Sequence, residues 1–245
     1  MSGAREDVLR RVRAALRDVP TGETPEDVPV PRDYRGAGVL QREEVAALFA
    51  ERVAEYRATV HRVTQDGIAE AVAEACARRG ARRIVVPPDL PDGWLPGEIE
   101  VVRDEGLSNA ALNDSDGVLS GCALGIAQTG TIVLDGGPRQ GRRAITLLPD
   151  YHLCVVFADQ LVELVPEAIA LLEAAARTGR PVTFISGPSA TSDIELQRVE
   201  GVHGPRTLEV LLVEEAVTQS PVLRRQRNAI RPAHVRESGR TGSRR

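Results

Sequence analysis

The chain of 245 residues contains no lysine, so all 31 of its positively charged side chains are arginine. A protein without lysine cannot use a lysine Schiff base with a carbonyl substrate. It also cannot supply the lysine with which a P-loop holds nucleotide phosphates. Two large classes of enzyme mechanism are therefore excluded before any motif is considered.

Cysteine is scarce, with Cys76, Cys122 and Cys154 far apart and no C-x-x-C pair. This spacing excludes an iron-sulfur cluster or zinc knuckle built from neighbouring cysteines. Isolated thiols of this kind are typical of buried apolar residues in a reducing compartment. The four histidines are separated and lack acidic partners at ligand spacing, which argues against a metal site. We therefore expect no metal and no cofactor in this chain.

Long apolar runs are also missing from the sequence. The amino terminus opens with the charged residues Arg5, Glu6 and Asp7 rather than an apolar signal core. No stretch reaches the roughly 20 apolar residues that a membrane-spanning helix needs. With a hydrophobic content of 42%, the composition is that of a folded soluble protein with one sizeable core. We expect a cytoplasmic protein without a membrane span.

Charge is distributed unevenly along the chain. After Ala216 there are eight arginines against the single acid Glu237, so the net charge of −4 leaves about −11 on residues 1–215. An acidic body argues against nucleic acid as a partner, because phosphate binding needs clustered cations. The arginine-rich tail is polar and without periodicity, which predicts disorder.

Apolar periodicity predicts an α/β fold. Strands expected to be almost continuously apolar, such as 152–157, are typical of a mainly parallel sheet with helices on both faces. We expect an N-terminal helix and extended arm over residues 1–40, a single α/β domain over 41–215 and the tail over 216–245. The predicted helices cover residues 5–17, 42–56, 67–79 and 166–177, and the predicted strands cover residues 59–63, 83–86, 100–103, 122–127, 131–134, 152–157, 182–185 and 208–213.

A turn rich in small and hydroxyl residues follows the strand that ends at Ile185. Small residues let a ligand approach the backbone, and the amino terminus of a following helix attracts anions. Ligands of open α/β sheets also bind outside the carboxyl ends of strands. We therefore expect a carboxylate or phosphate site here, although the same residues could merely cap a helix. The candidate ligand-binding residues of this turn are Ser186, Gly187, Pro188, Ser189, Asp193 and Glu195.

A second candidate segment is His203-Gly204-Pro205, just before the last predicted strand. An imidazole between glycines is poorly shielded and could exchange protons with a ligand. A structural role for His203 is the alternative. His152 begins an apolar strand, so we assign it a structural role.

The third candidate segment is Gln128-Thr129-Gly130-Thr131, which joins two strand-like runs. It is either a bulge within a hairpin or a place where backbone and hydroxyl groups meet a substrate. The glycine-rich, basic stretch from Asp135 to Arg143 could fold over an anion, but it lacks the P-loop spacing. We interpret it as a flexible hairpin loop.

Four motifs in order resemble those of the lactate-utilisation protein C family; the resemblance is strong over about residues 109–214 and loose over the amino-terminal half. They are Gly125 to Thr131, Leu147 to Pro149, Ile185 to Ser189 with Asp193 to Glu195, and Gly201 to Pro205. The resemblance implies an LUD domain with a fold similar to the NagB/RpiA/CoA-transferase group. It also implies a part in the oxidation of L-lactate to pyruvate, with iron-sulfur proteins as partners.

Gln128 departs from this family, which often has glutamate at the matching position. An amide can neither take up a proton nor form an acyl anhydride, which disfavours a carboxylate nucleophile there. We therefore expect a subunit that binds a small carboxylate or assists assembly, with iron-sulfur clusters only in its partners. The alternative is a stand-alone enzyme acting on an activated acid, phosphate or CoA-like compound, with His203 as acid/base and Asp193 as the residue that orients it.

Overall fold

The computed structural model describes residues 3–20, 22, 24, 27, 30, 31, 33–188, 190, 191, 199, 200 and 204–214. Contacts divide the chain into the units Met1–Arg35 and Gly36–Arg245. The first unit holds helix α1 (Gly3–Ala15), which has no buried residue. The sequence predicted this helix over residues 5–17. The tail expected from residue 216 lies outside the described residues.

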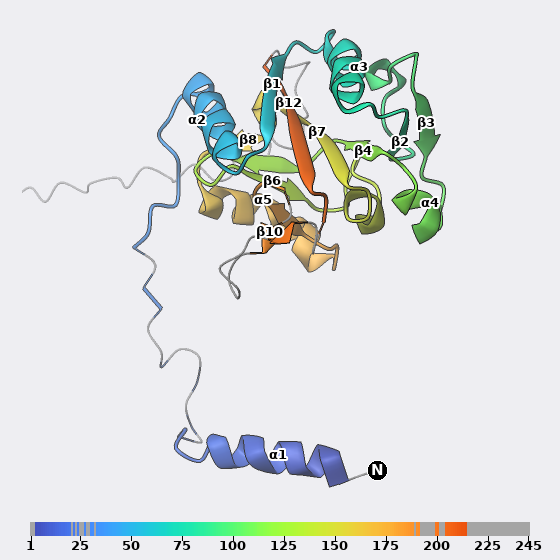
Figure 1. Cartoon of the computed structure of the whole chain (residues 1–245). Coiled ribbons are helices and arrows are strands. Elements are labelled where there is room, and N and C mark those ends of the chain that lie inside the picture. The colour runs from blue at the N-terminus through green and yellow to red at the C-terminus, as the bar shows by residue number, and fades with distance from the viewer. Residues whose placement is uncertain are drawn as a thin grey trace, which may run out of the picture. The chain divides into compact units, whose positions relative to one another are not determined.

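A six-stranded sheet in which all neighbouring strands are parallel forms the centre of the second unit (Figure 1). The seven-residue strands at its middle, β7 and β12, are almost entirely buried. This confirms the predicted α/β class with a mainly parallel sheet. In spatial order the strands are β1 (Thr59–Val63), β12 (Thr207–Val213), β7 (Tyr151–Phe157), β4 (Gly117–Ser120), β2 (Arg83–Val86) and β3 (Glu100–Arg103).

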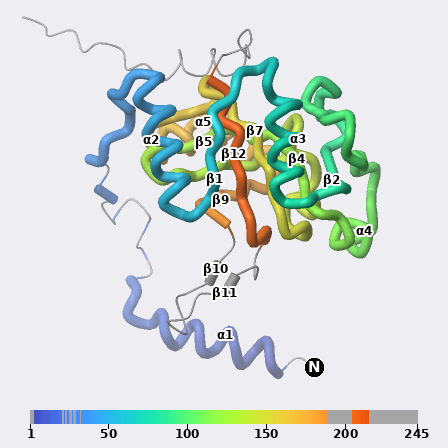
Figure 2. The backbone as a smooth tube through the Cα atoms, turned by 45° about the horizontal axis from the view of Figure 1, so that its top comes forward, coloured from blue at the N-terminus to red at the C-terminus, as the bar shows by residue number. Residues whose placement is uncertain are grey.

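Helix α3 (Ile68–Arg79) covers one face of this sheet (Figure 2). Its buried residues Ile68, Val72 and Cys76 share a core with apolar side chains of β7 and β12. The helix ends at Gly80, whose φ of +66° is left-handed and suits a residue without a Cβ. The sequence predicted both the helix and this ending.

The opposite face is covered by helix α2 (Arg42–Glu55) and by a second sheet. Helix α5 (Val165–Arg177) packs on that second sheet. The sequence pattern did not reveal this second sheet, because an apolar run looks alike in either sheet and only long-range pairing decides between them. The second sheet has the order β8 (Leu161–Val162), β5 (Leu124–Ile126), β6 (Thr131–Leu134) and β9 (Thr183–Ile185).

Short elements complete the described part of the chain. Strands β4, β8, β10 (Ala190–Thr191) and β11 (Val199–Glu200) were not predicted; the last three have only two residues each, too few to show a pattern. Strands β10 and β11 form an antiparallel pair. The other short elements are α4 (Asn109–Asn113) and three 3₁₀ turns at Asp92–Trp94 (η2), Arg143–Thr146 (η3) and Ala158–Gln160 (η4).

The loop from Asp135 to Arg143 is not the flexible hairpin that the sequence suggested. It leads from β6 in the second sheet to η3, so its ends are not paired strands. The buried Gln140 side chain accepts from the Asp135 N–H (2.7 Å) and donates to the Asp135 carboxylate (2.9 Å). The loop therefore has a definite shape, held by its own hydrogen bonds.

A buried carboxylate fixes the far end of this loop. Arg142 donates to both oxygens of Asp104, at 2.7 and 3.0 Å. The Asp104 side chain is only 2% exposed and also accepts from the backbone of Leu107 (3.0 Å). The Arg142 hydrogen bond, with smaller help from backbone donors, lowers the pKa of Asp104 below its usual 3.8, although burial opposes the shift.

We expect the substitution Asp104→Asn to lower the free energy of unfolding near neutral pH by about 2 kcal/mol, since it removes a charge-assisted bond to Arg142. A carboxylate with a lowered folded-state pKa stabilises the fold above its unfolded-state pKa. That contribution is lost as the pH falls through the folded-state value. The difference between wild type and variant, measured by urea unfolding, should therefore shrink below about pH 4. The exposed neighbour Glu105 provides the control Glu105→Gln, and equal effects of both substitutions would contradict the prediction.

Candidate functional site

The segment Gln128 to Gly130 forms the tight turn of the β5–β6 hairpin. The Gly130 N–H donates to the Ala127 carbonyl (3.3 Å), and Gly130 adopts a φ of +57°. A Cβ at Gly130 would lie 2.6 Å from the carbonyl carbon of Arg52 in α2. The structure thus shows a tight hairpin turn at this motif, with its glycine packed against α2.

A chain of hydroxyl groups links this turn to the end of β9. Thr129 and Thr131 share a hydrogen bond of 2.7 Å, and Thr131 shares another of 2.8 Å with Ser186. Thr131 is buried and Ser186 is exposed. The structure thus brings together two of the three segments that the sequence selected.

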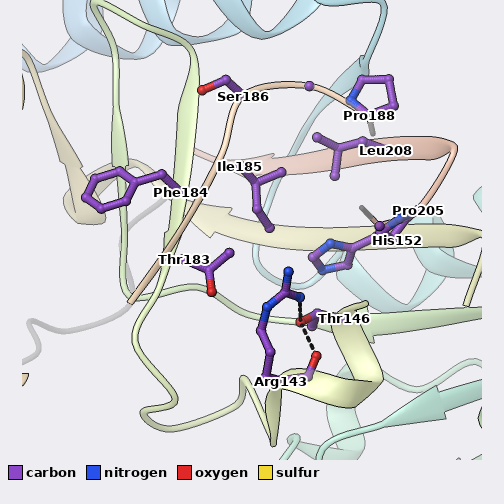
Figure 3. Close-up of a pocket in the computed structure, with 12 residues that line it drawn as sticks. Arg143, Thr146, His152, Thr183, Phe184, Ile185, Ser186, Pro188, Pro205 and Leu208 are labelled. Atoms are coloured by element: carbon purple, nitrogen blue, oxygen red, sulfur yellow. Dashed lines mark hydrogen bonds between the residues drawn. The ribbon is translucent and has the colours of Figure 1, made fainter. Parts of the chain in front are cut away.

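A cavity of about 220 Å³ opens beside Ser186 (Figure 3). Its volume lies below the range of about 300–1,000 Å³ of sites for drug-sized ligands, which suits a small molecule. Its walls come from the end of β9 with the following turn, from η3, and from the first residues of β7 and β12. They include Arg143, Thr146, His152, Thr183, Phe184, Ile185, Ser186, Gly187, Pro188, Gly204, Pro205 and Leu208.

Arg143 is the cation of this cavity. Its side chain is half-buried and donates to the Thr146 hydroxyl at 3.2 Å, and no carboxylate of the described residues forms an ion pair with it. Burial lowers the pKa of its guanidinium, and no acid of the described residues opposes this shift. A partly desolvated guanidinium without an acid is a binding group for a carboxylate or phosphate.

His152 lies beside Arg143 in the cavity wall (Figure 3). Its ring is 1% exposed, and Nε2 lies 2.8 Å from the Ser120 hydroxyl. That hydroxyl donates to the Gly121 carbonyl (3.0 Å), so it accepts from Nε2. The neutral ring then carries its proton on Nε2, which leaves Nδ1 as an acceptor.

The structure describes only some of the candidate residues. Ser186, Gly187, Pro188 and Gly204 line the cavity. The turn residues Gln128, Thr129, Gly130 and Thr131 are not part of its wall, and reach it only through the Thr131–Ser186 bond. The candidates Ser189, Asp193, Glu195 and His203 lie outside the described residues.

The cavity occupies a different edge of the fold from the one expected. The sequence placed the Ser186 turn at the carboxyl edge of the parallel sheet, but β9 belongs to the second sheet. His152 and Leu208 are the second residues of β7 and β12, so the cavity lies near the amino ends of these parallel strands. The direction of each strand in the fold, which a sequence pattern does not contain, produces this difference.

Sequence reasoning missed the polar residues Arg143, Thr146 and Thr183, and it gave His152 a purely structural role. Arg143 could have been found, because it ends the glycine-rich basic stretch that was considered as an anion site. Thr146 and Thr183 carry no signal of their own, and only the fold brings them to the cavity.

In the described part of the chain, no helix combines the length and hydrophobicity needed to cross a membrane. Within the same residues, no group of three or more histidine, cysteine or acidic side chains has the geometry of a metal site.

Comparison with known proteins identifies the family. The family model of the LUD domain matches residues 46–213. The chain is 44% identical over 211 residues to lactate utilization protein C of Deinococcus radiodurans, covering 86% of this chain and 95% of that protein. It is 28% identical over 171 residues to lactate utilization protein C of Bacillus licheniformis, covering 61% of this chain and 70% of the relative.

A solved structure is also similar to this chain. The crystal structure of a DUF162 family protein from Deinococcus radiodurans has a TM-score of 0.63 and 43% sequence identity to this chain. The match covers 71% of this chain and 99% of the other. The chain belongs to the LUD domain family.

Proposed function

We propose that this protein takes part in the utilisation of L-lactate and binds a small carboxylate in the cavity at Arg143 and His152. Two of its relatives are named lactate utilization protein C, which supports a role in this process. The half-buried guanidinium of Arg143, without an acid partner among the described residues, supports the ligand.

The other polar groups that line the cavity are also suited to bind a small carboxylate. A carboxylate bound to Arg143 would lie close to the Thr146 hydroxyl and to the His152 ring, which lie beside the guanidinium (Figure 3). The bond from His152 to Ser120 fixes the ring, so a hydroxyl or carbonyl next to the carboxylate would meet an ordered partner.

We propose that partner proteins, and not this chain, accept the electrons of lactate oxidation. Oxidation of lactate to pyruvate releases two electrons and two protons, which need an acceptor. Cys76, Cys122 and Cys154 are all buried in this chain's apolar core. Iron-sulfur partner proteins would accept the electrons, while this subunit holds or positions the carboxylate.

Binding of L-lactate tests the proposed ligand. We expect calorimetry to detect L-lactate or pyruvate binding, and no binding of neutral lactamide, which lacks the charge that Arg143 would meet. Arg143→Gln should weaken binding about 30-fold, since a hydrogen bond to a charged group contributes about 2 kcal/mol. The control Arg177→Gln removes an exposed arginine bonded to Glu173 and should leave binding unchanged. Equal binding by wild type and Arg143→Gln would overturn the assignment.

Growth tests the process separately. A strain without this protein should not grow on L-lactate as sole carbon source, and the Arg143→Gln variant should restore growth poorly. Normal growth of the deletion strain would refute a role in lactate utilisation. Affinity purification from lactate-grown cells should recover iron-sulfur proteins, and their absence would refute the subunit arrangement.

A further inference from the structure

Arg139 has a backbone conformation that is unusual for an arginine. Its φ is +63°, and of the described non-glycine residues only Arg57 shares this left-handed region. Glycines occupy the same region at Gly136 and Gly141 in the same loop, both with φ of +65°. Since glycine would adopt this conformation more readily, the presence of arginine indicates a role for its side chain.

Hydrogen bonds of its backbone fix the position of Arg139 in the fold. Its N–H donates to the Asp89 carboxylate (2.7 Å), and its carbonyl accepts from the Gly121 N–H (2.8 Å). Asp89 follows strand β2, and Gly121 follows strand β4. Arg139 is thus bonded on both sides to the loops that leave the carboxyl ends of two neighbouring strands of the parallel sheet.

These two strands mark the point at which the chain changes direction across the sheet. From β2 the chain continues outward to β3, and then returns to β4 on the other side of β2. Open α/β sheets bind ligands outside the carboxyl ends of strands at such a reversal. The cavity at Arg143 does not lie there, whereas Arg139 does.

The Arg139 guanidinium lies over two aromatic rings. Its central carbon is 5.6 Å from the Trp94 ring centre and 5.8 Å from that of Phe157, and the two rings are 5.7 Å apart. Trp94 is buried and Phe157 and Arg139 are half-buried. Contact with the rings orients the guanidinium and leaves its N–H groups for another partner.

No acid of the described residues neutralises this guanidinium. The two other arginines of this edge are paired, Arg103 with Asp92 and Arg142 with Asp104. The nearby Asp89 carboxylate bonds to the backbone of Arg139, and no ion pair joins it to the side chain. Among the described residues, Arg139 is therefore the arginine of this edge without an ion pair.

We propose that Arg139 binds an oxyanion, a carboxylate or phosphate group, at the carboxyl edge of the parallel sheet. A planar guanidinium whose orientation is already fixed loses little freedom when it forms two parallel N–H bonds to such a group. Trp94 and Phe157 supply an apolar surface next to the bound anion.

This site is separate from the cavity at Arg143. His152 lines that cavity near the start of β7, while Phe157 at the end of the same strand meets Arg139. Five residues of strand span about 16 Å, and an odd separation places the two side chains on opposite faces of the sheet. Loss of one site should therefore leave the other intact.

The single tryptophan of the chain provides the measurement, because Trp94 lies under Arg139. At constant ionic strength, we expect its fluorescence to change saturably with inorganic phosphate or with acetate, and not with chloride. Saturation by phosphate alone identifies a phosphate site, and saturation by acetate identifies a carboxylate site. Calorimetry with the same anions on the Arg143→Gln variant measures binding at Arg139 without the tryptophan signal and without the cavity at Arg143.

Two substitutions at Arg139 test whether its side chain binds the anion. Arg139→Gly suits the backbone and should fold normally, but bind the anion at least 10-fold more weakly. Arg139→Lys keeps the charge without the planar group and should bind more weakly than wild type. The control Arg177→Gln should behave as wild type. An absence of saturable binding in both measurements, or wild-type affinity in Arg139→Gly, would overturn the proposal.

Discussion

The substitution Gly130→Ala should lower the free energy of unfolding by about 3 kcal/mol. Gly130 has a φ of +57°, and an added Cβ would lie 2.6 Å from the carbonyl carbon of Arg52 and 2.7 Å from the Val53 nitrogen. The left-handed conformation costs an alanine about 1 kcal/mol. Displacing a buried helix backbone adds roughly 2 kcal/mol, the usual range for an overpacked site. Urea unfolding monitored by circular dichroism measures the loss.

Gly136→Ala is the matched control for this experiment. Gly136 has nearly the same backbone angle, with φ of +65°, but no atom lies within 4 Å of the place its Cβ would occupy. Only the conformational cost of about 1 kcal/mol should therefore remain. Equal losses in the two variants would show that contact with helix α2 contributes nothing at Gly130.

The substitution Phe49→Ala should destabilise the protein by about 4 kcal/mol. Phe49 is fully buried in α2, within the core between the two sheets. It lies so close to Gly125 of β5 that a Cβ there would be 3.0 Å from its ring. Truncating a buried phenylalanine removes its transfer free energy and leaves a cavity, which together cost about 3–5 kcal/mol.

Phe184→Ala makes the same change at an exposed position. Phe184 is 47% exposed on β9, so we expect a loss of less than about 1 kcal/mol. Both variants can be compared by thermal and urea unfolding. A small effect at Phe49 would contradict the packing of α2 against the core that the two sheets share.

The sequence was informative where local pattern is strong. The helix Ile68–Arg79 and its ending at Gly80 were predicted closely, because apolar spacing and a left-handed glycine are local signals. The strands Thr59–Val63 and Arg83–Val86 were also predicted with their observed bounds. Two-residue β8 carried no comparable signal, since a pair of apolar residues has no period.

The candidate site was predicted only in part. The sequence selected the Ser186 turn and Gly204, which line the cavity, because small residues before or after a strand are visible in a pattern. It assigned His152 a structural role and interpreted the stretch containing Arg143 as a flexible loop. The role of His152 and Arg143 depends on which side chains of other helices and strands lie next to them.

By itself the sequence determined the α/β class, the family motifs, and the absence of lysine chemistry. Only the tertiary structure decided that β5, β6, β8 and β9 form a second sheet, which moves the Ser186 turn to the amino ends of β7 and β12. It also placed the unpaired Arg143 in the cavity. Local propensities act between neighbours along the chain, whereas strand pairing and desolvation of a charge depend on residues far apart in sequence.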